Sequence, residues 1–67
     1  MENKPDGRRV RMTKLLLKNA LIDIMKTKSI HLISIKEICE EADVNRSTFY
    51  RHYNTQYDLY DEIIEDI

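Results

Sequence analysis

The sequence predicts a small all-α domain, and three observations support this fold class. The only Pro and the only Gly lie within the first seven residues, so nothing in the rest of the chain interrupts a helix by composition. Apolar residues then recur at helical spacing in successive segments, and polar capping residues stand between those segments. At 67 residues the chain is long enough for one domain. We expect three helices with a homeodomain-like helix-turn-helix arrangement, followed by the start of a fourth helix.

The first helix is expected from about Val10 to Thr27. Its apolar positions follow the i, i+3, i+4, i+7 pattern of a helix that buries one face. These positions are Leu17, Ala20, Leu21 and Ile24. Other apolar residues nearby widen this surface beyond one stripe, so we expect this helix to contact neighbours on more than one side.

The next two helices are short and lie on either side of a tight turn. The segment 34–37, Ser-Ile-Lys-Glu, matches a capping box, which predicts a helix from Ile35 to Ala42. Residues 43–45, Asp-Val-Asn, form the turn, because Asp tolerates a left-handed backbone and Asn is a strong N-cap. A third helix follows from Arg46 to His52. Two short helices around such a turn are typical of a helix-turn-helix.

The last helix is expected from about Gln56, with Thr55 as its cap and Asp58 at the capping-box position. Its apolar positions, Ile63 and Ile64 among them, continue to the final residue, Ile67. A domain of this size has little to bury Ile67 against. Two interpretations remain open, a fragment of a longer protein and a natural short protein that self-associates through these isoleucines.

The formal net charge of −1 conceals a gradient along the chain. Residues 1–28 hold eight basic and three acidic residues, a net of +5. Residues 29–53 hold three basic and four acidic residues, and residues 54–67 hold five acidic residues and no basic one. This asymmetry fits a domain with one side facing a polyanion, and equally fits a basic leader beside an acidic solvated helix.

The segment 44–53 contains the candidate chemistry. On a helix, Phe49 and Tyr53 share a face and should anchor it to the core, while the other faces present Arg, Ser, Thr, Tyr and His side chains. Such donors suit phosphates and base edges. We expect no metal site, no cofactor and no catalytic set, since Cys39 has the character of a small buried residue and His31 stands alone in a loop.

Several segments resemble the N-terminal DNA-binding domain of the TetR/AcrR family of bacterial transcriptional repressors. The resemblance covers Thr13 to about Ile64, and its most specific part is the string Ser-Thr-Phe-Tyr-Arg-His-Tyr at 47–53. It implies that the third helix enters the major groove of DNA. It also implies a fourth helix that leads into a second domain, which dimerises and binds a small-molecule inducer.

The resemblance assigns roles by position. It implies base contacts from Arg46, Ser47 and Thr48, and phosphate contacts from Ser34, Lys36, Tyr50 and His52. A basic arm would contact phosphates or the minor groove through Arg8, Arg9 and Arg11. Three positions depart from the usual pattern of the family: Asp43 in place of Gly, Cys39 in place of Ala, and Gln56 in place of a phosphate-binding Lys.

These inferences give the expected organisation. Residues 1–9 form a flexible basic arm, residues 10–54 the helix-turn-helix domain, and residues 55–67 the start of a helix that connects to a domain absent from this chain. The expected partners are a double-stranded DNA operator, a second copy in the full-length protein and an inducer, with no membrane, in the bacterial cytoplasm at the nucleoid. The alternative is a helical protein-interaction or self-association module that uses the apolar face of the last helix.

Overall fold

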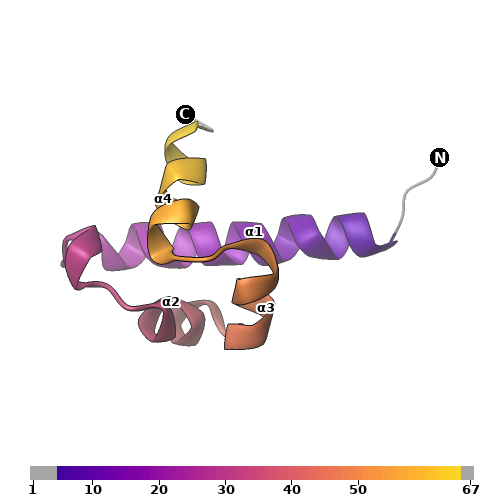
Figure 1. Ribbon diagram of the computed structural model, residues 1–67, viewed down its shortest axis with the longest axis horizontal. Coiled ribbons are helices and arrows are strands. Elements are labelled where there is room, and N and C mark those ends of the chain that lie inside the picture. Colours follow the sequence, from indigo (N-terminus) through magenta and orange to yellow (C-terminus); the bar gives the residue numbers. More distant parts are fainter. Residues whose placement is uncertain (1–4, 66–67) are drawn as a thin grey trace.

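A computed structural model of the chain describes residues 5–65, and all the regular secondary structure in this range is helical. It contains α1 (Pro5–Ile24), a short 3₁₀ turn η1 (Ile30–Leu32), α2 (Ile35–Ala42), α3 (Arg46–His52) and α4 (Gln56–Glu65) (Figure 1). The all-α prediction is confirmed, and the predicted bounds of the second and third helices agree with α2 and α3. The predicted position of Ile67 lies outside the described residues.

The first helix differs from its prediction at both ends. It begins at Pro5, five residues before the expected start at Val10, and ends at Ile24, three residues before the expected end. Proline is favoured at the first helical position and acidic residues in the first turn, and the chain has Pro5 followed by Asp6. Residues 5–9 are therefore helical, which corrects the expected flexible arm; residues 1–4 lie outside the described part of the chain.

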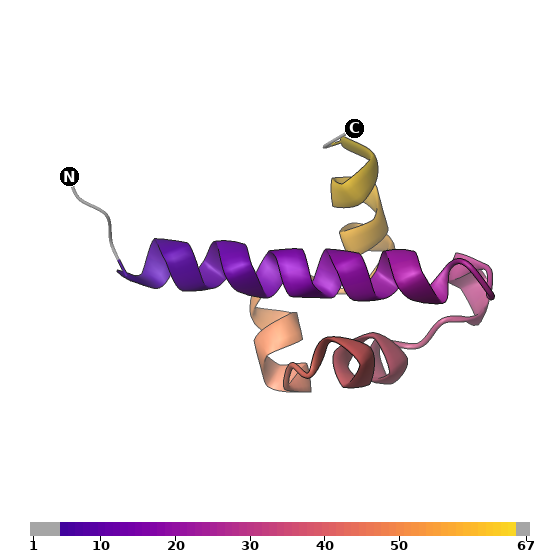
Figure 2. The same cartoon turned by 180° about the vertical axis from the view of Figure 1, so that it is seen from behind.

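The helices pack on two sides of α1. Figures 1 and 2 show α2 and α3 on one side of α1, with α4 crossing it and rising on the other side. The N-terminal turns of α1 extend beyond α3 in both views. One hydrophobic core joins all four helices through buried side chains, which are Leu17, Ala20, Leu21, Ile33, Ile38, Cys39, Ala42, Phe49, Tyr53 and Leu59.

The start of α2 is fixed by the predicted capping box. The Ser34 hydroxyl accepts a hydrogen bond from the Glu37 backbone N–H at 3.1 Å, and the Glu37 carboxylate accepts one from the Ser34 N–H at 3.1 Å. The Lys28 ammonium also bonds to the Glu37 carboxylate, and this bond is the main cause that lowers the pKa of Glu37. The connection that leads into α2 is thereby tied to its first turn.

The turn between α2 and α3 depends on Asp43. Its φ of 58° and ψ of 46° place it in the left-handed region, as predicted, and among the described residues it alone has a positive φ. The Val44 N–H bonds to the Cys39 carbonyl at 2.9 Å, which closes the end of α2. Asn45 stands at the predicted N-cap of α3, but its side chain makes no capping bond, and only its carbonyl accepts from the N–H groups of Thr48 and Phe49.

The start of α4 also follows its predicted cap. The Asp58 carboxylate accepts hydrogen bonds from the backbone N–H groups of Asn54 at 3.0 Å and Thr55 at 3.3 Å, while the Thr55 hydroxyl accepts from the Asp58 N–H. The connection between α3 and α4 is only three residues long. These bonds therefore fix where α4 begins after α3.

A polar cluster joins the C-terminal end of α3 to both α1 and α4. The Tyr53 hydroxyl donates to the Glu62 carboxylate, which also lies 3.6 Å from the Lys14 ammonium and 3.5 Å from that of Lys18. The Lys14 ammonium lies 5.8 Å from the centre of the Tyr53 ring. The Tyr53 hydrogen bond is the main cause that lowers the pKa of Glu62, with the two lysines adding to it. Three helices are held together at this point.

Replacing Asp43 should separate the backbone requirement of the turn from any role of the carboxylate. We expect Asp43→Gly to be more stable than Asp43→Ala by about 1 kcal/mol, because a Cβ is unfavourable in the left-handed region while glycine carries no such penalty. The measurement is the free energy of unfolding from urea denaturation of both variants. Equal stabilities would mean that the left-handed conformation at residue 43 carries no strain.

Neutralising Glu62 should reduce stability in a pH-dependent way. Because the folded pKa of Glu62 is lower than its usual value of 4.5, its ion pairs stabilise the fold above that pH and are lost as the pH falls through the folded pKa. We expect Glu62→Gln to cost at most about 1 kcal/mol at pH 7, since solvent weakens a pair this exposed, and to cost nothing at pH 2. Urea denaturation across pH measures this difference.

The matched control is Glu65→Gln, which removes a carboxylate from an exposed position of the same helix. This variant should follow the wild type across the whole pH range. A cost of Glu62→Gln that stays constant from pH 7 to pH 2 would contradict the assigned role of the carboxylate.

Candidate DNA interface

Helix α3, which the family resemblance places in the major groove as the recognition helix, is anchored by one face and presents three others. Phe49 is fully buried and Tyr53 is 5% exposed, so this face is fixed in the core. At helical spacing of four residues, Arg46 lies in line with Tyr50, Ser47 with Arg51, and Thr48 with His52. The Ser47–Arg51 ridge points most directly away from the core, because it lies opposite the two buried aromatic residues on the helical wheel. The burial of this face sets the orientation of α3, and therefore the direction in which its exposed residues project from the domain.

Arg46 and Lys36 lie together across the turn of the helix-turn-helix. Both line a shallow depression of about 290 Å³ formed by α2, the turn after it and the start of α3, and both are exposed. Cys39 closes its floor, where burial raises the pKa of the thiol. The acidic side chains of Glu40 and Asp43 line the same depression. The structure therefore brings one predicted base-contact residue beside one predicted phosphate-contact residue.

Tyr50 and Ser34 each keep a hydroxyl group that can donate to a phosphate. Tyr50 is 51% exposed, and its ring packs edge-on against Phe49 at a centroid distance of 5.6 Å. The Ser34 oxygen already accepts the capping bond from Glu37, but its O–H remains a donor. The capping role that holds α2 in place is thus compatible with the predicted phosphate contact.

Thr48 and His52 belong to a different part of the surface. They are half-buried and line a cleft of about 500 Å³ between α3 and the N-terminal turns of α1, to which Arg9 also contributes. Thr48 therefore faces α1, away from the line formed by Arg46 and Tyr50. Arg8 and Arg11 are exposed on α1 but do not line this cleft.

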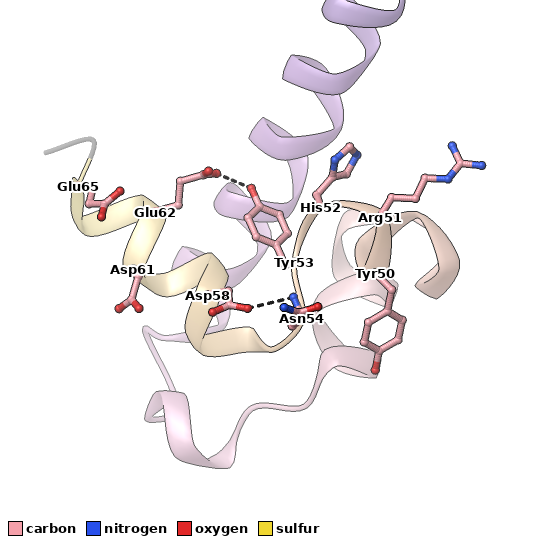
Figure 3. Close-up of a pocket in the computed structure, with 9 residues that line it drawn as sticks. All are labelled: Tyr50, Arg51, His52, Tyr53, Asn54, Asp58, Asp61, Glu62 and Glu65. Carbon is pink, nitrogen blue, oxygen red and sulfur yellow. Dashed lines mark hydrogen bonds between the residues drawn. The ribbon is translucent and has the colours of Figure 1, made fainter.

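Sequence reasoning assigned no role to Arg51, which is exposed on α3 and lines this same cleft. Figure 3 shows its side chain extending away from α4. A sequence signal for it existed, because residue 51 lies one turn after Ser47 on the helix face opposite the buried aromatic pair. Arg51 thus adds a cation to the exposed surface of α3.

The side of α3 that faces α4 is acidic. A pocket of about 350 Å³ between the end of α3 and α4 is lined by four carboxylates (Figure 3), which are Asp58, Asp61, Glu62 and Glu65. Tyr50, Arg51 and His52 of α3 line the same pocket, and its carboxylates make the side of α4 unfavourable for a polyanion.

Gln56, which stands where the family often has a phosphate-binding lysine, is used within the protein. Its side-chain amide donates a hydrogen bond to the Ile33 carbonyl at 2.9 Å in a partly buried position. This bond ties the first turn of α4 to the connection before α2. We expected no charged phosphate contact from Gln56, and its amide instead holds two segments of the protein together.

The described residues contain neither a cluster of three or more His, Cys, Asp or Glu side chains able to hold a metal ion nor a helix long and apolar enough to cross a membrane. His31 lies in the η1 turn, where its Nδ1 atom is 3.2 Å from the Tyr57 hydroxyl. Cys39 is 5% exposed, as expected for a small buried side chain. The surface of α3 and its surroundings therefore remain the candidate site.

Comparisons with known proteins agree with this geometry. An uncharacterized HTH-type transcriptional regulator, YxbF of Bacillus subtilis (strain 168), is 35% identical over 51 residues, which is 76% of this chain and 13% of that protein. The HTH-type dhaKLM operon transcriptional activator DhaS of Lactococcus lactis subsp. lactis (strain IL1403) is 31% identical over 55 residues, which is 82% of this chain and 29% of that protein. The chain thus spans less than a third of the length of these curated relatives. No solved structure matches it significantly.

The family comparison covers the helix-turn-helix itself. The sequence profile described as "Bacterial regulatory proteins, tetR family" matches residues 19–63, which extend from the second half of α1 into α4. The matched segment includes the capping box, the left-handed turn at Asp43 and the whole recognition helix. The chain therefore belongs to the TetR family of bacterial regulatory proteins, and its helix-turn-helix is a DNA-binding domain of that family.

Proposed function

We propose that this domain reads a specific operator in double-stranded DNA by placing α3 in the major groove. Arg46 and Ser47 contact base edges, and Thr48 adjoins them at the edge of the α1 cleft. The observation that carries this proposal is the burial of Phe49 and Tyr53, which fixes α3 so that its exposed donors have a set direction. An arginine presented in this way suits the two acceptors of guanine in the major groove.

Phosphate contacts on both sides of α3 complete the proposed interface. Ser34 and Lys36 lie at the start of α2, and Tyr50 and His52 lie on α3 itself. Such contacts set the position and orientation of the protein on the duplex and carry no sequence information directly. The carboxylates of α4 support an orientation in which α4 faces away from DNA, with Tyr50 and His52 at the border between the acidic pocket and the proposed interface.

The whole protein is proposed to be a homodimer with a second, inducer-binding domain after α4. The segments of the curated relatives that match this chain make up less than a third of those proteins, so those proteins contain further chain besides a DNA-binding domain. Two copies would place their recognition helices in successive major grooves, about 34–36 Å apart. The proposed location is the bacterial cytoplasm at the nucleoid, where an operator is found.

Repression is the proposed outcome of binding, because occupying a promoter is enough to block transcription. Activation would need a further contact with the transcription machinery. DhaS carries the name of an activator, so a relative of this domain serves activation in that protein. The direction of regulation for this chain follows from where its operator lies relative to the promoter.

The alternative function, a protein-interaction module, would use an apolar surface between α1 and α4. Ile22, Met25, Tyr60, Ile63 and Ile64 line this surface, and Ile64 is 48% exposed. The membership in the TetR family does not favour this alternative, since apolar surface at this position is also compatible with a following domain.

A duplex titration tests the proposed function against this alternative. We expect a fluorescently labelled duplex of random sequence to bind the chain at low salt, with a dissociation constant of about 10⁻⁴–10⁻⁶ M at physiological salt and a steep loss of affinity as salt rises. Absence of binding at low salt, together with self-association in sedimentation experiments, would contradict the proposal and support the interaction module.

Arg46→Ala should change sequence preference, whereas Tyr50→Phe should not. We expect the first variant to lose discrimination at one or two base pairs by about 1–3 kcal/mol each, if the arginine contact is bidentate. The second removes a phosphate donor, so it should weaken binding to all sequences alike. Selection of binding sites from a random pool measures both effects. Identical preferences for wild type and Arg46→Ala would remove Arg46 from base recognition.

A further inference from the structure

Neither Arg46 nor Tyr50 lines the cleft between α1 and α3. The N-terminal turns of α1 extend beyond α3 (Figures 1 and 2) and form one wall of the cleft, while α3 forms the other. Its volume is about 500 Å³. The lining side chains are Arg9, Val10 and Thr13 from α1, and Thr48, Arg51 and His52 from α3.

The chemistry of this lining suits an anion. Two guanidinium groups, an imidazole and two hydroxyls line the cleft, and no carboxylate is among the described residues that line it. Arg51 and His52 also line the acidic pocket beside α4, so they lie between the two surfaces. Neither Arg9 nor Arg51 forms an ion pair with any side chain that the structure describes. Planar guanidinium groups match the oxygen atoms of a phosphate in paired hydrogen bonds.

Both walls of the cleft are regular helices, so its donors are already arranged. Arg9 and Thr13 are four residues apart and share a face of α1, because the helix begins at Pro5. Thr48 shares a face of α3 with Arg51 and His52, three and four residues later. The cleft exists because residues 5–9 are helical and do not form the flexible arm expected from the sequence.

We propose that this cleft binds one phosphate group of the DNA backbone, held between Arg9 of α1 and Arg51 of α3. The inference rests on the proposed function, since it assumes that α3 occupies the major groove. A helix in that groove, which is about 12 Å wide, has a phosphate backbone on each side. The part of α1 that extends beyond α3 lies where it meets one of these backbones, and Thr13, Thr48 and His52 supply further donors.

The test compares charge-matched variants in the intact chain. Affinity for a labelled duplex of random sequence is measured by fluorescence anisotropy over a series of salt concentrations. Arg9→Gln and Arg51→Gln should each reduce the slope of log K against log salt by about 1, because one phosphate contact is lost. The control Lys26→Gln removes the same charge from an exposed position just after the C-terminal end of α1 and outside the cleft, and its slope should stay close to that of the wild type.

A double variant asks whether the two arginines hold the same phosphate. The affinity losses of Arg9→Gln and Arg51→Gln should be less than multiplicative when combined, whereas those of Arg8→Gln and Arg51→Gln should multiply. Equal effects of Arg9→Gln and Lys26→Gln, or multiplicative losses in the first pair, would overturn the shared site. Unchanged helical circular dichroism confirms that each variant is folded.

A second probe separates this inference from the proposed function. Inorganic phosphate is titrated into the isotope-labelled chain, and backbone amide signals are followed by NMR. Shifts confined to Thr13, Thr48 and Arg51, absent in the double variant Arg9→Gln/Arg51→Gln, would support the cleft even if no duplex binds and the proposed function fails. Shifts spread evenly over all exposed basic residues would overturn it, even if the duplex binds.

Discussion

The burial of Phe49 and Tyr53 holds the recognition helix in place, and every other property of the interface depends on it. The helix α3 has seven residues, and isolated helices shorter than about 12–15 residues are only marginally stable in water. Its stability therefore comes from packing, to which a fully buried aromatic side chain contributes about 1.5–3 kcal/mol. Tyr53 adds a directional constraint, because its hydroxyl bonds to Glu62 of α4 while its ring lies near Lys14 of α1.

The distribution of charge explains how a chain with a net charge of −1 serves as a DNA-binding domain. The acidic residues of α4 line one pocket beside α3, and two of them also form bonds within the protein. Asp58 caps α4, and Glu62 pairs with two lysines. The exposed arginines of α1 and Arg46 of α3 do not line that pocket, whereas Arg51 of α3 does. Net charge averages over these two sides and so says little about either.

Sequence reasoning succeeded where the structure is set by neighbouring residues. The bounds of α2 and α3, the capping box at Ser34 and the left-handed conformation of Asp43 all follow from a few adjacent side chains, and each was predicted. It failed where contacts join distant segments. The bond from Gln56 to Ile33 spans 23 residues, and the convergence of Arg9 and Arg51 spans 42 positions, so neither leaves a local pattern.

The start of α1 shows how a small error in a helix boundary changes a functional argument. A basic arm without structure would have to lose conformational freedom when it binds DNA, and each ordered residue would cost about 1–2 kcal/mol of backbone entropy. Because the helix begins at Pro5, the backbone of residues 5–9 is already ordered, and Arg9 lies on the face of α1 that meets α3. In the proposed phosphate contact, Arg9 would then lose only the conformational freedom of its side chain. The helical backbone would also limit which part of the DNA backbone this side chain can reach, so the first helix would help to set the register of α3 in the groove.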